Sequence, residues 1–182
     1  MANHSVNQKY SELLNSLKGK EKIRILFVCL GNICRSPAAE GIMRAVVESE
    51  GAGVDDGTGV GRWVIDSAGT GGWHVGDLPD RRMRIHARRR GYELEHICRQ
   101  VRPSDFDNFD LIIGMDDNNV RNLRKMAPTV EAEAKVVPMI DFVDPGMGFD
   151  HIPDPYYDGA DGFERVLTLL EDGCRRLYDT LS

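Results

Sequence analysis

One short segment combines the residue types needed to bind and attack a phosphate group. It reads CLGNICRSP from Cys29 to Pro37, with an arginine five intervening residues after the first cysteine. Arg35 can hold two phosphate oxygens at once through its planar guanidinium group. Backbone N–H groups of a tight loop at a helix start also bind anions, and these positive surroundings favour the nucleophilic thiolate of Cys29. The pattern predicts phosphoryl transfer through a cysteine.

The other residues of this loop favour the same interpretation. Gly31 permits a backbone turn that a side chain would obstruct, and Asn32 tolerates a left-handed conformation. Ser36 can donate a hydrogen bond to the thiolate and stabilise it as a leaving group. A lone cysteine is more often a buried core residue. Here, however, Gly31, Asn32, Arg35, Ser36 and Pro37 all follow Cys29 at the end of an apolar run, and the set favours a functional site. The predicted phosphate-binding residues are Leu30, Gly31, Asn32, Ile33, Cys34 and Arg35.

A second loop must supply a proton if the leaving group is a phenolate, because the phenol of tyrosine has a pKa near 10. Asp154, in the segment PDPYYDG, is the best candidate for this general acid, since flanking prolines stiffen its loop. Spacing alone leaves three competitors, which are Asp144, Asp150 and Asp158.

The elements that must position these residues alternate between apolar strands and amphipathic helices. This alternation predicts an α/β fold of three layers: a four-stranded parallel sheet with helices on both faces, and the phosphate loop directly after the first strand. Pro138 indicates that the fourth strand lies at an edge. The expected strands are 23–29, 63–67, 110–115 and 135–140. Four helices are expected: one that starts at Pro37, one over 79–90, one over 117–126, and one from Phe163 to Leu181.

The composition excludes several other classes of protein. The net charge of the 182 residues is −6 at pH 7, which argues against a nucleic-acid partner. No stretch is apolar enough to span a membrane, and residues 1–20 do not read as a secretory signal. Four cysteines in a chain of this length favour reduced thiols and a cytoplasmic location. We expect residues 1–22 to form an extension with a short amphipathic helix, and residues 23–182 to form the catalytic domain.

CLGNICRSP together with the later DPYY resembles the low-molecular-weight protein tyrosine phosphatases, over roughly residues 23–179. The resemblance implies a phosphocysteine on Cys29, phosphate binding by Arg35, and Asp154 acting as general acid and then as base. It implies no metal and no cofactor, a phosphotyrosine-containing protein as substrate, and inorganic phosphate or vanadate as inhibitors. It also implies loop-bracing roles for Asn32, Ser67 and His96, aromatic walls from Trp73, Tyr156 and Tyr157, and a weaker role near the cleft rim for Asp116.

Three alternatives stay open beside this interpretation. Arsenate reductase shares the fold, but it needs two further cysteines close together, and Cys98 and Cys174 are far apart in the sequence. A protein-arginine phosphatase belongs to the same family, and that branch resembles this chain less at Ile33, where it favours threonine. An anion-sensing adaptor without activity is disfavoured because nucleophile, arginine and acid are all present. By resemblance, Cys34 could also form a reversible disulfide with Cys29.

Overall fold

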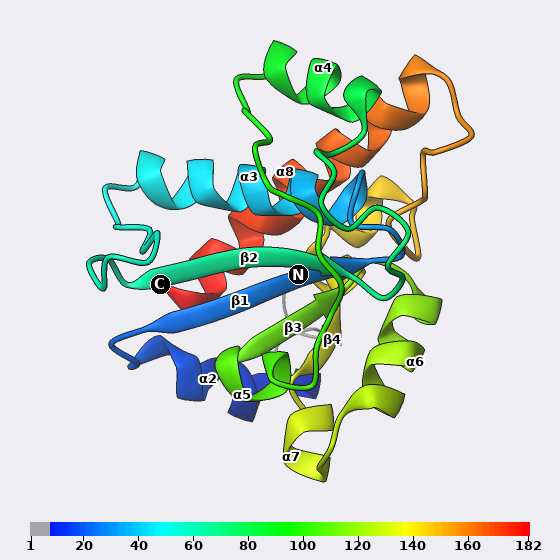
Figure 1. The fold of residues 1–182 in the computed structure, drawn as a ribbon. Helices are drawn as coiled ribbons and strands as arrows, with labels where there is room; N and C mark the ends of the chain where they lie inside the picture. The colour runs from blue at the N-terminus through cyan, green and yellow to red at the C-terminus, as the bar shows by residue number, and fades with distance from the viewer. Residues whose placement is uncertain (1–7) are drawn as a thin grey trace.

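A four-stranded parallel sheet forms the centre of the computed structural model, which describes residues 8–182 (Figure 1). The strand order is β2-β1-β3-β4, so the strand that precedes the phosphate loop is an inner one. The strands are β1 (Ile23–Cys29), β2 (Trp63–Gly69), β3 (Leu111–Gly114) and β4 (Val136–Pro138). The helices are α2 (Ser11–Lys18), α3 (Arg35–Ser49), α4 (Arg81–Arg89), α5 (Asp105–Asn108), α6 (Asp117–Met126), α7 (Val130–Glu133) and α8 (Ala160–Leu181).

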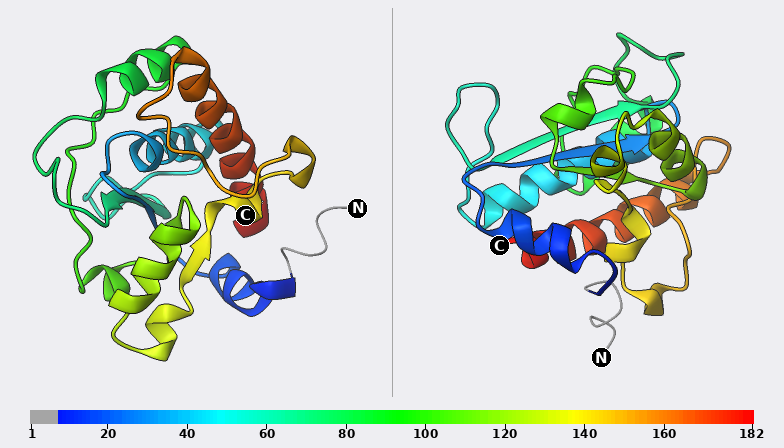
Figure 2. Two further views of the ribbon diagram at one scale, coloured as in Figure 1. Left: turned by 90° about the vertical axis from the view of Figure 1, so that its right-hand side faces the viewer. Right: turned by 90° about the horizontal axis from the view of Figure 1, so that it is seen from below.

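The alternation of side chains along β1 builds two separate cores. Ile25 and Phe27 point into the larger core, under α3 and α8, whereas Leu26 and Val28 point into the smaller one, under α5 and α6. The view from below shows helices on the two opposite faces of the sheet (Figure 2, right). The three-layer parallel α/β fold predicted from the sequence is therefore confirmed.

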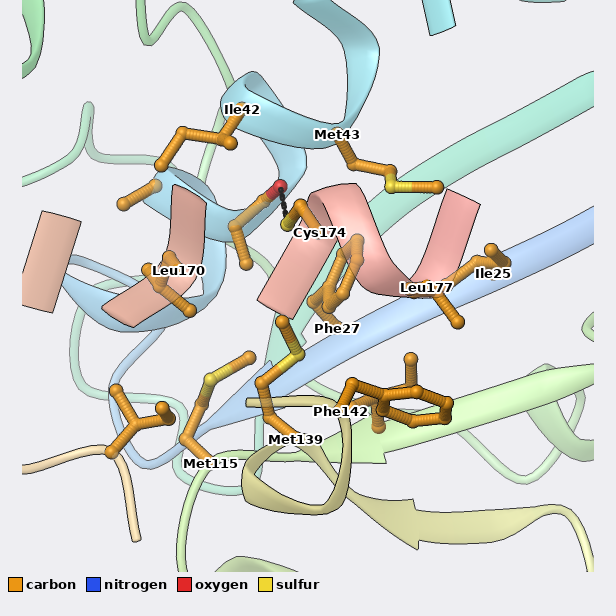
Figure 3. Packing of buried hydrophobic residues seen from close by; sticks show 14 of the residues in the cluster. Ile25, Phe27, Ile42, Met43, Met115, Met139, Phe142, Leu170, Cys174 and Leu177 are labelled. Carbon is orange, nitrogen blue, oxygen red and sulfur yellow. Dashed lines mark hydrogen bonds between the residues drawn. The ribbon is translucent and has the colours of Figure 1, made fainter. Parts of the chain in front are cut away.

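Figure 3 shows how closely the larger core is packed around the middle of α8. Cys174 is fully buried there, and its Sγ donates to the Ala39 carbonyl oxygen of α3 at 3.7 Å. Burial also raises the pKa of Cys174. A thiol held in this way between two core helices does not fit the mobile cysteine pair that arsenate reductase chemistry requires.

Several element boundaries differ from the sequence-based expectation, and two of them lie next to the phosphate loop. Helix α3 begins at Arg35 rather than at Pro37, which places Arg35 itself in the first turn. Pro37 is tolerated at the third position because the first four N–H groups of a helix have no partner inside the helix. Strand β2 runs on to Gly69, two residues past the expected end. A Cβ at Gly69 would lie 2.8 Å from the Leu30 carbonyl oxygen, so only glycine lets this strand pass so close to the phosphate loop.

Part of the predicted N-terminal extension lies outside the described residues, namely residues 1–7. The described part contains α2, which packs against α8 and buries Leu14 and Leu17 in the larger core. Among residues 8–182, no helix has the length and apolar character that crossing a bilayer requires.

Candidate active site

The loop between β1 and α3 turns its carbonyl groups toward the protein. Each of four carbonyl oxygens accepts a hydrogen bond from a neighbouring segment. Because a trans peptide points its C=O and its N–H in opposite directions, the following amide N–H groups point away from those segments. Successive N–H groups on the open side of a tight loop are a site for an oxyanion. The four bonds are Thr70 N to Cys29 O (2.9 Å), Gly71 N to Leu30 O (2.8 Å), Cys98 Sγ to Asn32 O (2.8 Å) and Asp80 N to Ile33 O (2.8 Å).

Asn32 holds the middle of this loop in a strained conformation. Its φ is +56°, and it is the one non-glycine residue with positive φ among the described residues. Its buried side chain donates two hydrogen bonds and accepts two. Its amide nitrogen donates to Ser36 Oγ (2.9 Å) and Ser67 Oγ (3.0 Å), and its oxygen accepts from His96 Nε2 (2.8 Å) and the Arg99 N–H (3.0 Å). These four bonds compensate for the strain. Gly31 has no positive φ, but a Cβ there would lie 3.2 Å from His74 Cδ2, so a side chain at this position would crowd the turn, as expected from the sequence.

A buried carboxylate that was not among the residues predicted from the sequence completes the brace. Glu40 Oε1 accepts from Ser67 Oγ (3.0 Å) and lies 3.1 Å from His96 Nδ1. Three hydrogen bonds and the close contact of His96 with Glu40 thus join Asn32, Ser67, Glu40 and His96 into a closed ring behind the loop. The signal in the sequence was a charged residue on the buried face of the helix, four positions after Ser36.

The same region gathers three side chains of types that bind metals. Ligand atoms of Glu40, Asp66 and His96 all lie within 4.8 Å of one another, although nothing in their spacing along the chain indicates this. Arg44 donates to Glu40 at 3.2 Å, and Arg99 donates to Asp66 at 3.0 Å. Both carboxylates are therefore paired with arginine, and the histidine is bonded to Asn32 through Nε2, while its Nδ1 faces Glu40 at 3.1 Å and Asp66 at 3.5 Å. The geometry is that of a structural network.

Arg35 is the most buried charged group at the cleft, with 2% of its surface exposed. Its Nη1 donates to Asp116 Oδ2 at 2.7 Å and to the Ile152 carbonyl oxygen at 3.0 Å. Its Nε has no hydrogen-bond partner within residues 8–182, which points to an anionic ligand. Burial disfavours the charge, but the Cys29 thiolate and Asp116 outweigh burial and raise the pKa of Arg35. Asp116, assigned only a weak role from the sequence, thus orients the guanidinium directly.

Cys29 and Cys34 lie in the same loop in different surroundings. Cys29 Sγ is 3.0 Å from Ser36 Oγ. Ser36 Oγ accepts from Asn32, and its own proton has two acceptors within reach, the Cys29 sulfur at 3.0 Å and the Ala68 carbonyl oxygen at 3.4 Å. Burial and the negative charges of Asp80 and Cys29 raise the pKa of Cys34, which keeps this second thiol protonated at neutral pH. Cys29 therefore has the hydrogen bond that a thiolate nucleophile needs, and Cys34 does not compete with it.

A cleft of about 230 Å³ opens above the loop. Asp154 stands at its rim with its Oδ2 3.7 Å from Arg35 Nη2, and it is the one of the four candidate aspartates that lines the cleft. Trp73, Tyr156 and Tyr157, the residues that the resemblance implied as aromatic walls, line the opening. His74 also lines the cleft, and no pattern in the sequence indicated it.

Comparisons with known proteins agree with this geometry. Residues 24–182 match the family model described as low molecular weight phosphotyrosine protein phosphatase. A low molecular weight protein-tyrosine-phosphatase of Streptomyces coelicolor is 44% identical over 151 residues, which are 81% of this chain and 87% of that protein.

Solved structures match as well. A protein tyrosine phosphatase from Entamoeba histolytica, with Hepes in the active site, is 42% identical with a TM-score of 0.80, covering 88% of this chain and 97% of that one. A Drosophila arginine phosphatase is 30% identical with a TM-score of 0.75, covering 86% of this chain and 96% of that one. From the family match, the sequence identity and the shared fold, this chain belongs to the low molecular weight protein tyrosine phosphatases, a family of hydrolases.

Proposed function

We propose that this enzyme hydrolyses phosphotyrosine in proteins through a phosphocysteine on Cys29. The loop amides and Arg35 bind the phosphate dianion, and the Cys29 sulfur attacks phosphorus while the tyrosine oxygen leaves with a proton from Asp154. Asp154 then accepts a proton from water, which attacks phosphorus and releases inorganic phosphate. Ser36 stabilises the thiolate as it departs. The observation that carries the proposal is the convergence of Cys29, Arg35 and Asp154 on one cleft with aromatic sides.

Replacing Asp154 by alanine tests the proton transfer. General acid catalysis contributes about 10²- to 10⁴-fold, and the gain is largest for poor leaving groups. In Asp154→Ala we therefore expect kcat/KM to fall by roughly 10²-fold or more for phosphotyrosine, and far less for an activated aryl phosphate. The measurement is kcat/KM across a series of aryl phosphates of rising leaving-group pKa. Equal losses along the series would assign the acid role to another residue.

A panel of phosphopeptides tests the substrate class. Ile33 and the aromatic residues at the mouth give the cleft apolar sides suited to a phenyl ring. We expect turnover of a phosphotyrosine peptide to exceed that of matched phosphoserine and phosphoarginine peptides by at least about 10²-fold, the loss expected when a well-oriented substrate is misplaced. Preferred turnover of the phosphoarginine peptide would instead group this enzyme with the arginine phosphatase branch. Ile33→Thr is the matched variant for that comparison.

The same proposal covers the remaining assignments. Residues 23–182 form the catalytic unit, and residues 1–22 form an appendage whose described helix rests on α8. Inorganic phosphate and vanadate compete with substrate because they occupy the loop as tetrahedral oxyanions. The enzyme works in a reducing compartment such as the cytoplasm, because Cys29 must be a free thiol, and all four cysteines are unpaired.

A further inference from the structure

An ion pair at the start of α4 lies between the phosphate loop and the acid loop. Asp80 is the N-cap of α4, and its backbone N–H donates to the Ile33 carbonyl oxygen inside the phosphate loop at 2.8 Å. Its carboxylate receives two bonds from one arginine: Arg82 Nη2 at 2.9 Å and Arg82 Nε at 3.2 Å. Two parallel bonds fix the plane of a guanidinium group, not only its position. Arg82 is therefore held in one orientation relative to the phosphate loop.

The fixed guanidinium of Arg82 contacts two aromatic rings that come from another part of the chain. Its carbon lies 4.8 Å from the ring centre of Phe163, in the first turn of α8, and 5.4 Å from that of Tyr156. Both distances are within the range of cation–π attraction. Phe163 is buried and further fixed by stacking on His86, whereas Tyr156 is half-exposed at the mouth of the cleft. Figure 1 shows α4 beside the first turns of α8.

Tyr156 in turn is tied to the general acid. Its backbone N–H donates to Asp154 Oδ1 at 3.1 Å, which leaves Oδ2 directed toward Arg35. A displacement of Tyr156 thus moves the carboxylate that must meet the leaving oxygen. The chain of contacts runs from the phosphate loop through Asp80, Arg82 and Tyr156 to Asp154. It joins the nucleophile's loop to the acid's loop outside the direct pair of Arg35 and Asp154.

We infer that Arg82 is a positioning residue for the reaction: it holds Tyr156, and through it Asp154, in register with the phosphate loop. This inference rests on the proposed role of Asp154 as the acid. Arg82 does not reach the reacting atoms, and its effect is transmitted through the ring of Tyr156. A change at Arg82 should therefore resemble a partial loss of the acid, rather than a loss of phosphate binding.

The test is the dependence of kcat/KM on leaving-group pKa in Arg82→Ala. We expect kcat/KM for phosphotyrosine to fall by about tenfold, and that for p-nitrophenyl phosphate by much less, since misplacing a catalytic group by an ångström can cost up to about 10²-fold. Inhibition by inorganic phosphate should stay near the wild-type value. Asp80→Ser keeps a capping side chain but removes the two-bond grip, so it should shift the slope in the same direction by a smaller amount. Arg89→Ala, on an exposed position of the same helix, should leave the slope unchanged.

Two further comparisons separate the possible outcomes. Adding Arg82→Ala to Asp154→Ala should steepen the slope no further, because the acid is already absent. An equal loss for every leaving group in Arg82→Ala, or no loss at all, would overturn the positioning role. If Asp154→Ala itself fails to steepen the slope, the proposed acid is wrong, and that result is distinct from a failure confined to Arg82. Circular dichroism of each variant tests whether the fold is retained.

Discussion

Cys29→Ser should lower kcat by roughly 10⁴- to 10⁶-fold, since removing a nucleophile eliminates the covalent route altogether. Serine keeps the size of the side chain and the contact with Ser36 Oγ, but its hydroxyl is not ionised at neutral pH. The loop amides and Arg35 are unchanged in this variant. We therefore expect inorganic phosphate and vanadate to bind nearly as before. The measurements are turnover of a phosphotyrosine peptide and calorimetric titration with phosphate.

A cysteine elsewhere in the fold provides the control for this experiment. Cys174 lies in the core between α3 and α8, away from the cleft, so Cys174→Ala should keep its turnover and lose only some stability. Substantial residual activity in Cys29→Ser would contradict the phosphocysteine route. Loss of phosphate binding in that variant would show that the sulfur, and not the loop, dominates anion affinity.

Arg35→Lys should lower kcat/KM by roughly 10³-fold or more, the range found when a guanidinium that stabilises a phosphoryl transition state is removed. Lysine keeps the positive charge but cannot bond Asp116, the Ile152 carbonyl and two phosphate oxygens with one planar group. In contrast to Cys29→Ser, this variant should also lose affinity for phosphate and vanadate. Steady-state kinetics give kcat/KM, and competitive inhibition by phosphate and vanadate gives the two affinities.

The comparison of the two variants is the informative part of the design. We expect Cys29→Ser to bind phosphate without turning over substrate, and Arg35→Lys to do neither well. That difference would show that Cys29 attacks the phosphate group and that Arg35 binds it. Arg89→Lys is the matched control for the change of side chain at an exposed position. Near-normal activity in Arg35→Lys would mean that charge alone is sufficient, and that the planar geometry is dispensable.

The sequence by itself predicted the elements and the phosphate loop, because both depend on local patterns. The apolar run Ile23–Cys29 indicated a strand buried on both faces, and five residues between Cys29 and Arg35 match the span of one anion-binding turn. Pro138 indicated an edge strand because proline cannot donate to a neighbour, and β4 does lie at the edge of the sheet. The flanking prolines favoured Asp154 and the family resemblance implied the same residue, although spacing alone did not separate it from three other aspartates.

The hydrogen-bonded residues behind the phosphate loop could be predicted only in part from the sequence, because they come from several elements. Glu40 on α3 bonds Ser67 on β2 and faces His96 on the segment that follows α4, and no local pattern relates these positions. The hydrogen bond from Arg35 to Asp116 and the contact of Arg82 with Tyr156 also join segments that are far apart in the sequence.

Local sequence thus indicated which residues are candidates for the chemistry, since a strand, a tight turn and a helix start are defined by neighbours along the chain. Only the tertiary structure decided which side chains hold them in place. Hydrogen bonds and ring contacts between distant segments depend on how the layers pack, and the packing is a property of the whole chain.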